Sequence, residues 1–98
     1  MLWRHGDVLI ASIDAIPAGA QRHTGSVLAY GEATGHAHCI ADPTTAELWE
    51  QHGQLFLRVV AAAQLIHEEH QAISLPVGTY RVWQQREYTP AEIKHIKD

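Results

Sequence analysis

The feature that most constrains the fold is a succession of short, β-prone segments separated by turn residues. Residues 79–85 alternate apolar or aromatic side chains with polar ones, which is typical of a half-buried strand. Residues 7–13 are rich in valine and isoleucine and follow the turn-like pair His5-Gly6. Many such segments at close spacing predict an all-β fold, a small antiparallel barrel or sandwich.

Two hairpins are predicted from pairs of these segments. Residues 27–30 and 36–40 are joined by a short connection with glycine at each end. Residues 47–50 and 55–60 flank the turn-forming pair His52-Gly53. Each pair has the length and punctuation of two adjacent antiparallel strands.

Three other segments are less uniform. Thr44 and Glu47 have the spacing of a capping box, so a short helix within residues 44–52 competes with the hairpin. Residues 61–70 contain good helix formers but also alternate, and both helix and strand remain open there. An N-cap threonine followed by proline predicts a short C-terminal helix, residues 89–97.

Length and composition set the class of protein. A chain of 98 residues fits one domain, residues 1–98, that buries a single core. The net charge of −4 argues against an extended nucleic-acid partner, because a phosphate-binding surface is basic. Cys39 is the only cysteine, so we expect no internal disulfide and a cytoplasmic location. No apolar run approaches the length that crosses a bilayer, so we expect no membrane partner.

Histidine, with eight residues, is the unusual part of the composition. On a strand, His36 and His38 point to the same side, because successive side chains alternate. His67 and His70 form a second pair about thirty residues later. If the two pairs converge, their imidazoles are suited to a divalent ion such as zinc, iron, manganese or nickel. The four histidines are therefore the predicted metal ligands.

Three further residues are predicted to take part in catalysis. Glu68 lies inside the second histidine pair and is a natural general base toward metal-bound water. Arg86 offers a bidentate clamp for a carboxylate or phosphate, and Tyr88 offers a hydrogen-bond donor or a stacking surface.

Two short motifs resemble the cupin superfamily of small β-barrels. The sequence His36-Ala37-His38 resembles its H-x-H pair, and Pro76-Val77-Gly78 resembles its later P-x-G turn. The resemblance implies a metal-holding barrel. The match is partial, since no glutamate follows His38 at the usual short interval and Tyr80 stands where the closing histidine is expected. The chain also resembles short bacterial proteins known only as hypothetical.

Three function hypotheses follow. The first is a His-rich metal site that supports metal-assisted hydrolysis or lyase chemistry on a small-molecule substrate. The second keeps the pocket without a metal, as a histidine acid–base phosphodiesterase or ribonuclease with Arg86 stabilising charge. The third is a non-enzymatic interaction or assembly module whose edge strands pair with another chain, including a second copy in a homo-oligomer.

Overall fold

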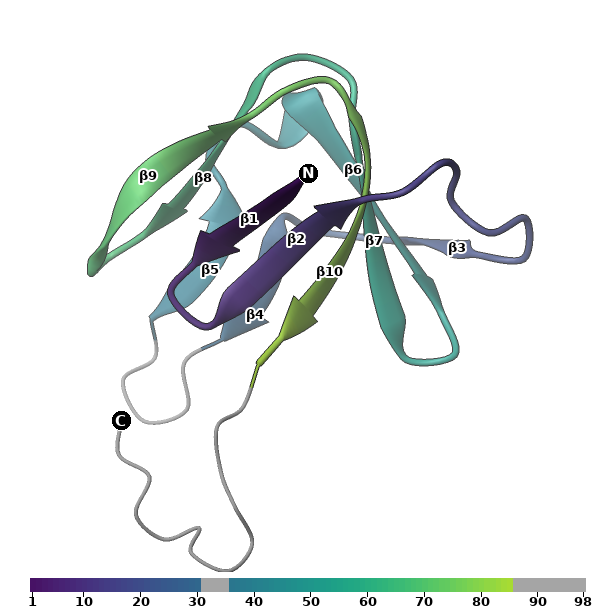
Figure 1. Ribbon diagram of the computed structural model, residues 1–98, viewed down its shortest axis with the longest axis horizontal. Helices are drawn as coiled ribbons and strands as arrows, with labels where there is room; N and C mark the ends of the chain where they lie inside the picture. Colours follow the sequence, from purple (N-terminus) through teal and green to yellow (C-terminus); the bar gives the residue numbers. More distant parts are fainter. Residues whose placement is uncertain (31–35, 86–98) are drawn as a thin grey trace, which may run out of the picture.

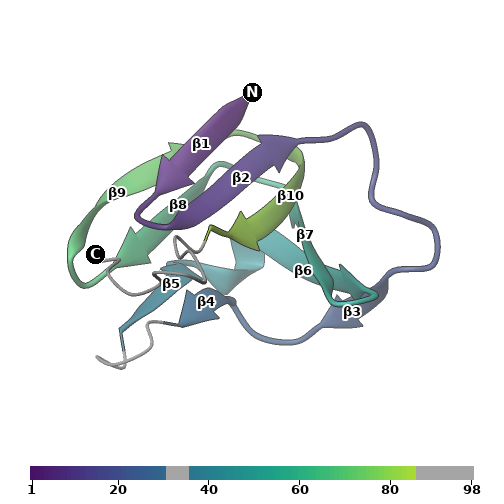
Figure 2. The ribbon, with the colours of Figure 1, turned by 60° about the horizontal axis from the view of Figure 1, so that its bottom comes forward.

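The computed structural model describes residues 1–30 and 36–85, and in these ranges the fold is all-β. Ten strands form two antiparallel sheets (Figures 1 and 2). The strands are β1 Leu2–His5, β2 Val8–Ser12, β3 Gln21–His23, β4 Val27–Tyr30, β5 Ala37–Ile40, β6 Ala46–Gln51, β7 Gln54–Val59, β8 Ala63–His67, β9 His70–Leu75 and β10 Gly78–Gln84.

The larger sheet has the strand order β1-β2-β10-β7-β6-β3. Two tight turns fix its hairpins. Gly6, with a φ of 65°, begins the two-residue turn between β1 and β2, where only glycine tolerates this geometry without cost. His52 and Gly53 both have positive φ, which matches the right-handed twist of the β6–β7 hairpin.

The smaller sheet has the strand order β4-β5-β8-β9 and carries two irregularities. The register of β4 on β5 shifts between Val27 and Ala29, next to the partner residue His38. The register of β8 on β9 shifts between Leu65 and His67. Such bulges bend a strand and redirect nearby side chains. Both irregularities lie beside histidines.

The core lies between the two sheets, because both contribute buried apolar side chains to one cluster. The cluster contains Val8, Ile10, Leu28, Ile40, Leu48, Leu57, Val59, Ala63, Leu65, Leu75, Tyr80 and Val82. On β2, β7, β8 and β10 the cluster residues stand two positions apart, as expected when one face of a sheet is buried. Burial of this cluster holds the two sheets face to face.

The prediction of an all-β fold is confirmed, and the barrel alternative is wrong. A barrel has no edges, whereas the described strands form two separate sheets. Figures 1 and 2 show β1 beside β9 where the sheets approach. A contact of the His5 side chain with the Gln71 carbonyl, described below, joins the two strands there.

Most of the local expectations are confirmed. Both hairpins form, and the capping-box segment contributes only a 3₁₀ turn at Pro43–Thr45 before β6. Residues 61–70 resolve in favour of strand, since β8 and β9 form a hairpin there. The strand β3 pairs antiparallel with β6 at the edge of the larger sheet.

The predicted helix at residues 89–97 lies outside the described residues. In the described part of the chain, no helix has the length and hydropathy that crossing a bilayer requires.

Candidate functional site

Histidines from four strand ends gather at one end of the molecule. His5 ends β1, His38 lies within β5, and His67 and His70 flank the β8–β9 turn. His36 immediately precedes β5. The short β1–β2 and β8–β9 turns place His5, His67 and His70 close to one another where the two sheets approach.

Three of these imidazoles form the centre of the cluster. The ring centroids of His38 and His67 are 4.3 Å apart, those of His67 and His70 4.5 Å, and those of His38 and His70 5.5 Å. One ring nitrogen from each lies within 4.8 Å of the other two. Nitrogens bound to a tetrahedral ion at 2.0–2.1 Å are separated by about 3.3–3.4 Å. A contraction of at most about 1.4 Å per pair therefore brings these three donors into coordination distance.

A second group overlaps the first. His36, His67 and Glu68 each offer one ligand atom, and these atoms also lie within 4.8 Å of one another. The ring of His36 stands almost perpendicular to that of His67, at 87° and 5.6 Å between centroids. His36 Nδ1 is 3.4 Å from a carboxylate oxygen of Glu69. His67 is thus the ring that the two groups share.

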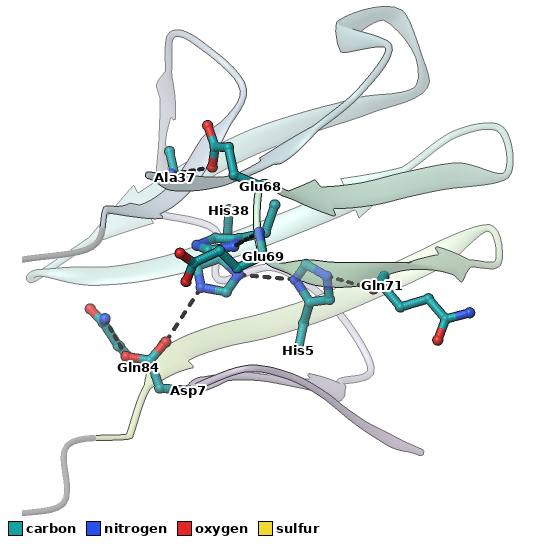
Figure 3. Close-up of polar contacts among 9 residues, drawn as sticks. His5, Asp7, Ala37, His38, Glu68, Glu69, Gln71 and Gln84 are labelled. Atoms are coloured by element: carbon teal, nitrogen blue, oxygen red, sulfur yellow. Dashed lines mark hydrogen bonds and ion pairs between the residues drawn. The ribbon is translucent and has the colours of Figure 1, made fainter. Parts of the chain in front are cut away.

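His5 fixes the tautomer of His38 through a chain of contacts (Figure 3). His5 Nε2 is 3.0 Å from the Gln71 carbonyl, which can only accept, so Nε2 carries the proton. In neutral His5, Nδ1 is then an acceptor, and His38 Nδ1 donates to it across 2.9 Å. This leaves the lone pair of neutral His38 on Nε2.

Burial keeps both rings of this chain neutral. His5 and His38 are each 3% exposed. Burial lowers the pKa of His38 from 6.5 to about 4, and the neighbouring His67 and His5 rings add to the effect. Burial also lowers the pKa of His5, although its hydrogen bond with Gln71 opposes the shift. At pH 7 both rings are therefore neutral, and each has one nitrogen without a proton. Neutral imidazole is the form that binds metal.

Asp7 faces the lone pair of His38. Its Oδ1 lies 3.4 Å from His38 Nε2, and its Oδ2 accepts a 2.6 Å hydrogen bond from Gln84 Nε2 (Figure 3). Two acceptors facing each other repel unless a cation lies between them. The separation of 3.4 Å equals the ligand–ligand spacing expected around a tetrahedral ion.

Backbone contacts hold the β8–β9 turn against the start of β5. Glu68 Oε1 accepts a 3.1 Å hydrogen bond from the Ala37 amide (Figure 3). Hydrogen bonds from its own backbone amide and from that of Ala37 lower the pKa of Glu68, so its carboxylate is ionised at neutral pH. The Glu69 amide donates to His67 Nδ1 across 2.9 Å. Neutral His67 therefore carries its proton on Nε2, and coordination through Nε2 would require the proton to move to Nδ1 in place of the Glu69 hydrogen bond.

Gly6 lies directly against the cluster. A Cβ atom at this position would stand 2.6 Å from His70 Nε2 and 3.0 Å from His38 Cε1. The glycine thus serves two purposes, since it provides the positive φ of the turn and leaves space for two imidazoles.

The structure brings together all four histidines predicted as metal ligands. His36, His38, His67 and His70 come from two strand pairs, as expected if remote segments converge. Glu68 lies beside them. The other predicted catalytic residues, Arg86 and Tyr88, lie outside the described residues.

The sequence interpretation missed His5 and Asp7. Both flank Gly6 at the β1–β2 turn, whereas the sequence pattern assigns His5 to a turn and Asp7 to the start of a strand. The sequence signal that could have identified them is a histidine and an aspartate on the two sides of a turn glycine. Their position against His38, however, depends on the packing of β1 near β9, which no local pattern reveals.

One of three comparisons with known proteins gives a family assignment. No curated protein and no solved structure matches the chain. A family model described as "Domain of unknown function (DUF8820)" matches residues 4–85. This range includes every histidine of the cluster as well as Asp7 and Glu68. Because the match spans most of its length, the chain belongs to the DUF8820 family.

Proposed function

We propose that this protein binds a divalent transition-metal ion through His38, His67 and His70. The observation that carries the proposal is the position of buried His38, whose Nε2 lies 3.4 Å from a carboxylate oxygen of Asp7 and whose ring contacts those of His67 and His70. A metal ion between these atoms would turn a repulsive contact into two coordination bonds.

The donor set favours certain metals. Three imidazoles without a thiolate suit zinc, nickel, iron or copper more than calcium or magnesium. Zinc is the natural first probe, because it accepts a tetrahedral site of three imidazoles and one further ligand. Asp7 or a water molecule would take that fourth position.

Metal-assisted hydrolysis or lyase chemistry is the reaction class that such a site would support. An ion with three protein ligands lowers the pKa of a bound water toward neutrality. Asp7 and Glu68 are ordered carboxylates at the cluster that could accept the proton of that water. Gln84 links Asp7 to a hollow of about 260 Å³, also lined by Leu28, Leu55 and Val82, which suits a small molecule.

Zinc titration of untagged protein tests the proposal. We expect one tightly bound zinc that is lost in His70→Ala, a variant that removes an exposed ring and leaves the core untouched. His23→Ala is the matched control, since His23 lies exposed on β3 beside Glu50, outside the cluster. If His70→Ala retains the zinc affinity of the native protein, the proposed site is wrong.

The metal-free alternative, acid–base cleavage of a phosphodiester by the histidines, stays a prediction of the sequence. Phosphodiesterase activity that persists in excess chelator would favour this alternative over the metal site. The interaction module and self-association remain predictions of the sequence.

A further inference from the structure

A second cation position lies beside the first. His36, His67 and Glu68 present donor atoms within 4.8 Å of one another, and none of the three is buried as His38 is. We propose that this group binds a second divalent ion and that His67 bridges the two ions. The inference rests on the proposed function, because His67 belongs to both ligand groups.

Glu68 is held in place for this role. Its Oε1 accepts the Ala37 amide at 3.1 Å, which ties the turn to the residue that follows His36. The carboxylate therefore does not have to be ordered when an ion arrives, and its charge favours a cation. The His36 imidazole, just before β5, and the Glu68 carboxylate, in the β8–β9 turn, form a mixed nitrogen and oxygen donor set suited to zinc.

Glu69 supplies a further oxygen. Its Oε2 lies 3.4 Å from His36 Nδ1, the same separation as between Asp7 Oδ1 and His38 Nε2. Each position thus pairs one histidine with one carboxylate at the spacing of neighbouring ligands around a tetrahedral ion. The histidines of both pairs contact the shared His67 ring, with centroid distances of 5.6 Å for His36 and 4.3 Å for His38.

Bridging has a defined proton balance. In the ion-free protein, His67 Nδ1 accepts the Glu69 amide and Nε2 carries the ring proton. When both nitrogens coordinate, the Glu69 hydrogen bond breaks and the ring proton leaves to solvent. The ring then carries one negative charge, which offsets part of the repulsion between the ions.

The second position should be the weaker one. The side chain of His36 is 29% exposed and that of Glu69 is 62% exposed, whereas that of His38 is 4% exposed. Solvent screens the exposed ligands, and the first ion repels the second. We expect the second zinc to bind at least about tenfold more weakly than the first.

Zinc stoichiometry tests the inference on the full chain, purified without a tag. We expect two zinc ions per chain at saturation, and one in both His36→Ala and Glu68→Gln, with the tight ion unaffected. Glu68→Gln keeps the acceptor for the Ala37 amide, so loss of the weak ion in this variant reflects the missing charge. His23→Ala should retain both ions.

The outcomes separate this inference from the proposed function. One zinc in the native protein, unchanged in His36→Ala, overturns the second position and leaves the first intact. One zinc that is weakened in His36→Ala also overturns it, because His36 would then serve the single ion. No bound zinc in the native protein refutes both proposals.

Discussion

The two glycines with positive φ at Gly6 and Gly53 offer a matched test of the site geometry. Both occupy hairpin turns, with φ values of 65° and 78°. An alanine in this region of φ and ψ costs roughly 1–2 kcal/mol. At Gly53 that is the whole cost, because a Cβ there meets nothing within 4 Å. At Gly6 a Cβ would come 2.6 Å from His70 Nε2 and 3.0 Å from His38 Cε1.

The added Cβ of Gly6→Ala should both lower the stability of the fold and weaken zinc binding. The exposed His70 ring can swing away, whereas the buried His38 ring cannot, so Gly6→Ala adds overpacking of about 1 kcal/mol. For a domain of this size, 1 kcal/mol lowers the Tm by about 4–8 °C. Displacing one ligand should weaken zinc binding by about 10–100-fold.

Thermal unfolding and zinc titration of the two variants check these numbers. We expect Gly6→Ala to melt at least about 4 °C below Gly53→Ala. Only Gly6→Ala should lose zinc affinity, because a Cβ at Gly53 meets no atom within 4 Å and therefore touches no histidine. Equal Tm values together with equal zinc affinities would refute the geometry described for the cluster.

Three further predictions follow from the cluster and the turns. In chelator, the free energy of unfolding should fall by on the order of 3 kcal/mol as pH decreases from 6.5 to about 4, because His38 binds a proton in the unfolded chain but not in the folded one. Urea denaturation that gives the same free energy of unfolding across this pH range would contradict the lowered pKa of His38. His5→Phe should weaken zinc binding by about 10–100-fold, whereas His5→Gln should weaken it less, because glutamine keeps a donor for the Gln71 carbonyl and an acceptor for His38. Calorimetry that finds equal zinc affinities in the two variants would count against the hydrogen bonds from His38 to His5 and from His5 to Gln71. His52→Asn should raise the free energy of unfolding by roughly 0.5 kcal/mol, because asparagine tolerates a φ of 52° better than histidine does. A lower free energy of unfolding in chemical denaturation would argue against this turn geometry.

The sequence predicts most of the β-structure because the information is local. Alternation at residues 79–85 and the pair His52-Gly53 specify β10 and the β6–β7 hairpin without reference to the rest of the chain. Sheet pairing is different, since β10 lies between β2 and β7, which are far apart in sequence. Whether the strands close into a barrel depends on such distant pairings, and the barrel alternative was wrong for that reason.

Part of the candidate site is likewise predictable from local sequence patterns. Alternation along a strand places His36 and His38 on one side, and both rings contact His67. The roles of His5 and Asp7 could not be predicted, because they arise from the approach of β1 to β9. The difference between a one-ion and a two-ion cluster depends on distances of a few ångströms, which only the folded structure provides.

X-ray absorption spectroscopy of the protein loaded with one equivalent of zinc tests the central claim most directly. A site made by His38, His67 and His70 predicts a first shell of nitrogen or oxygen at about 2.0–2.1 Å. It also predicts strong outer-shell scattering from about three imidazole rings around the zinc. A zinc ion surrounded only by oxygen, without imidazole scattering, would contradict the account.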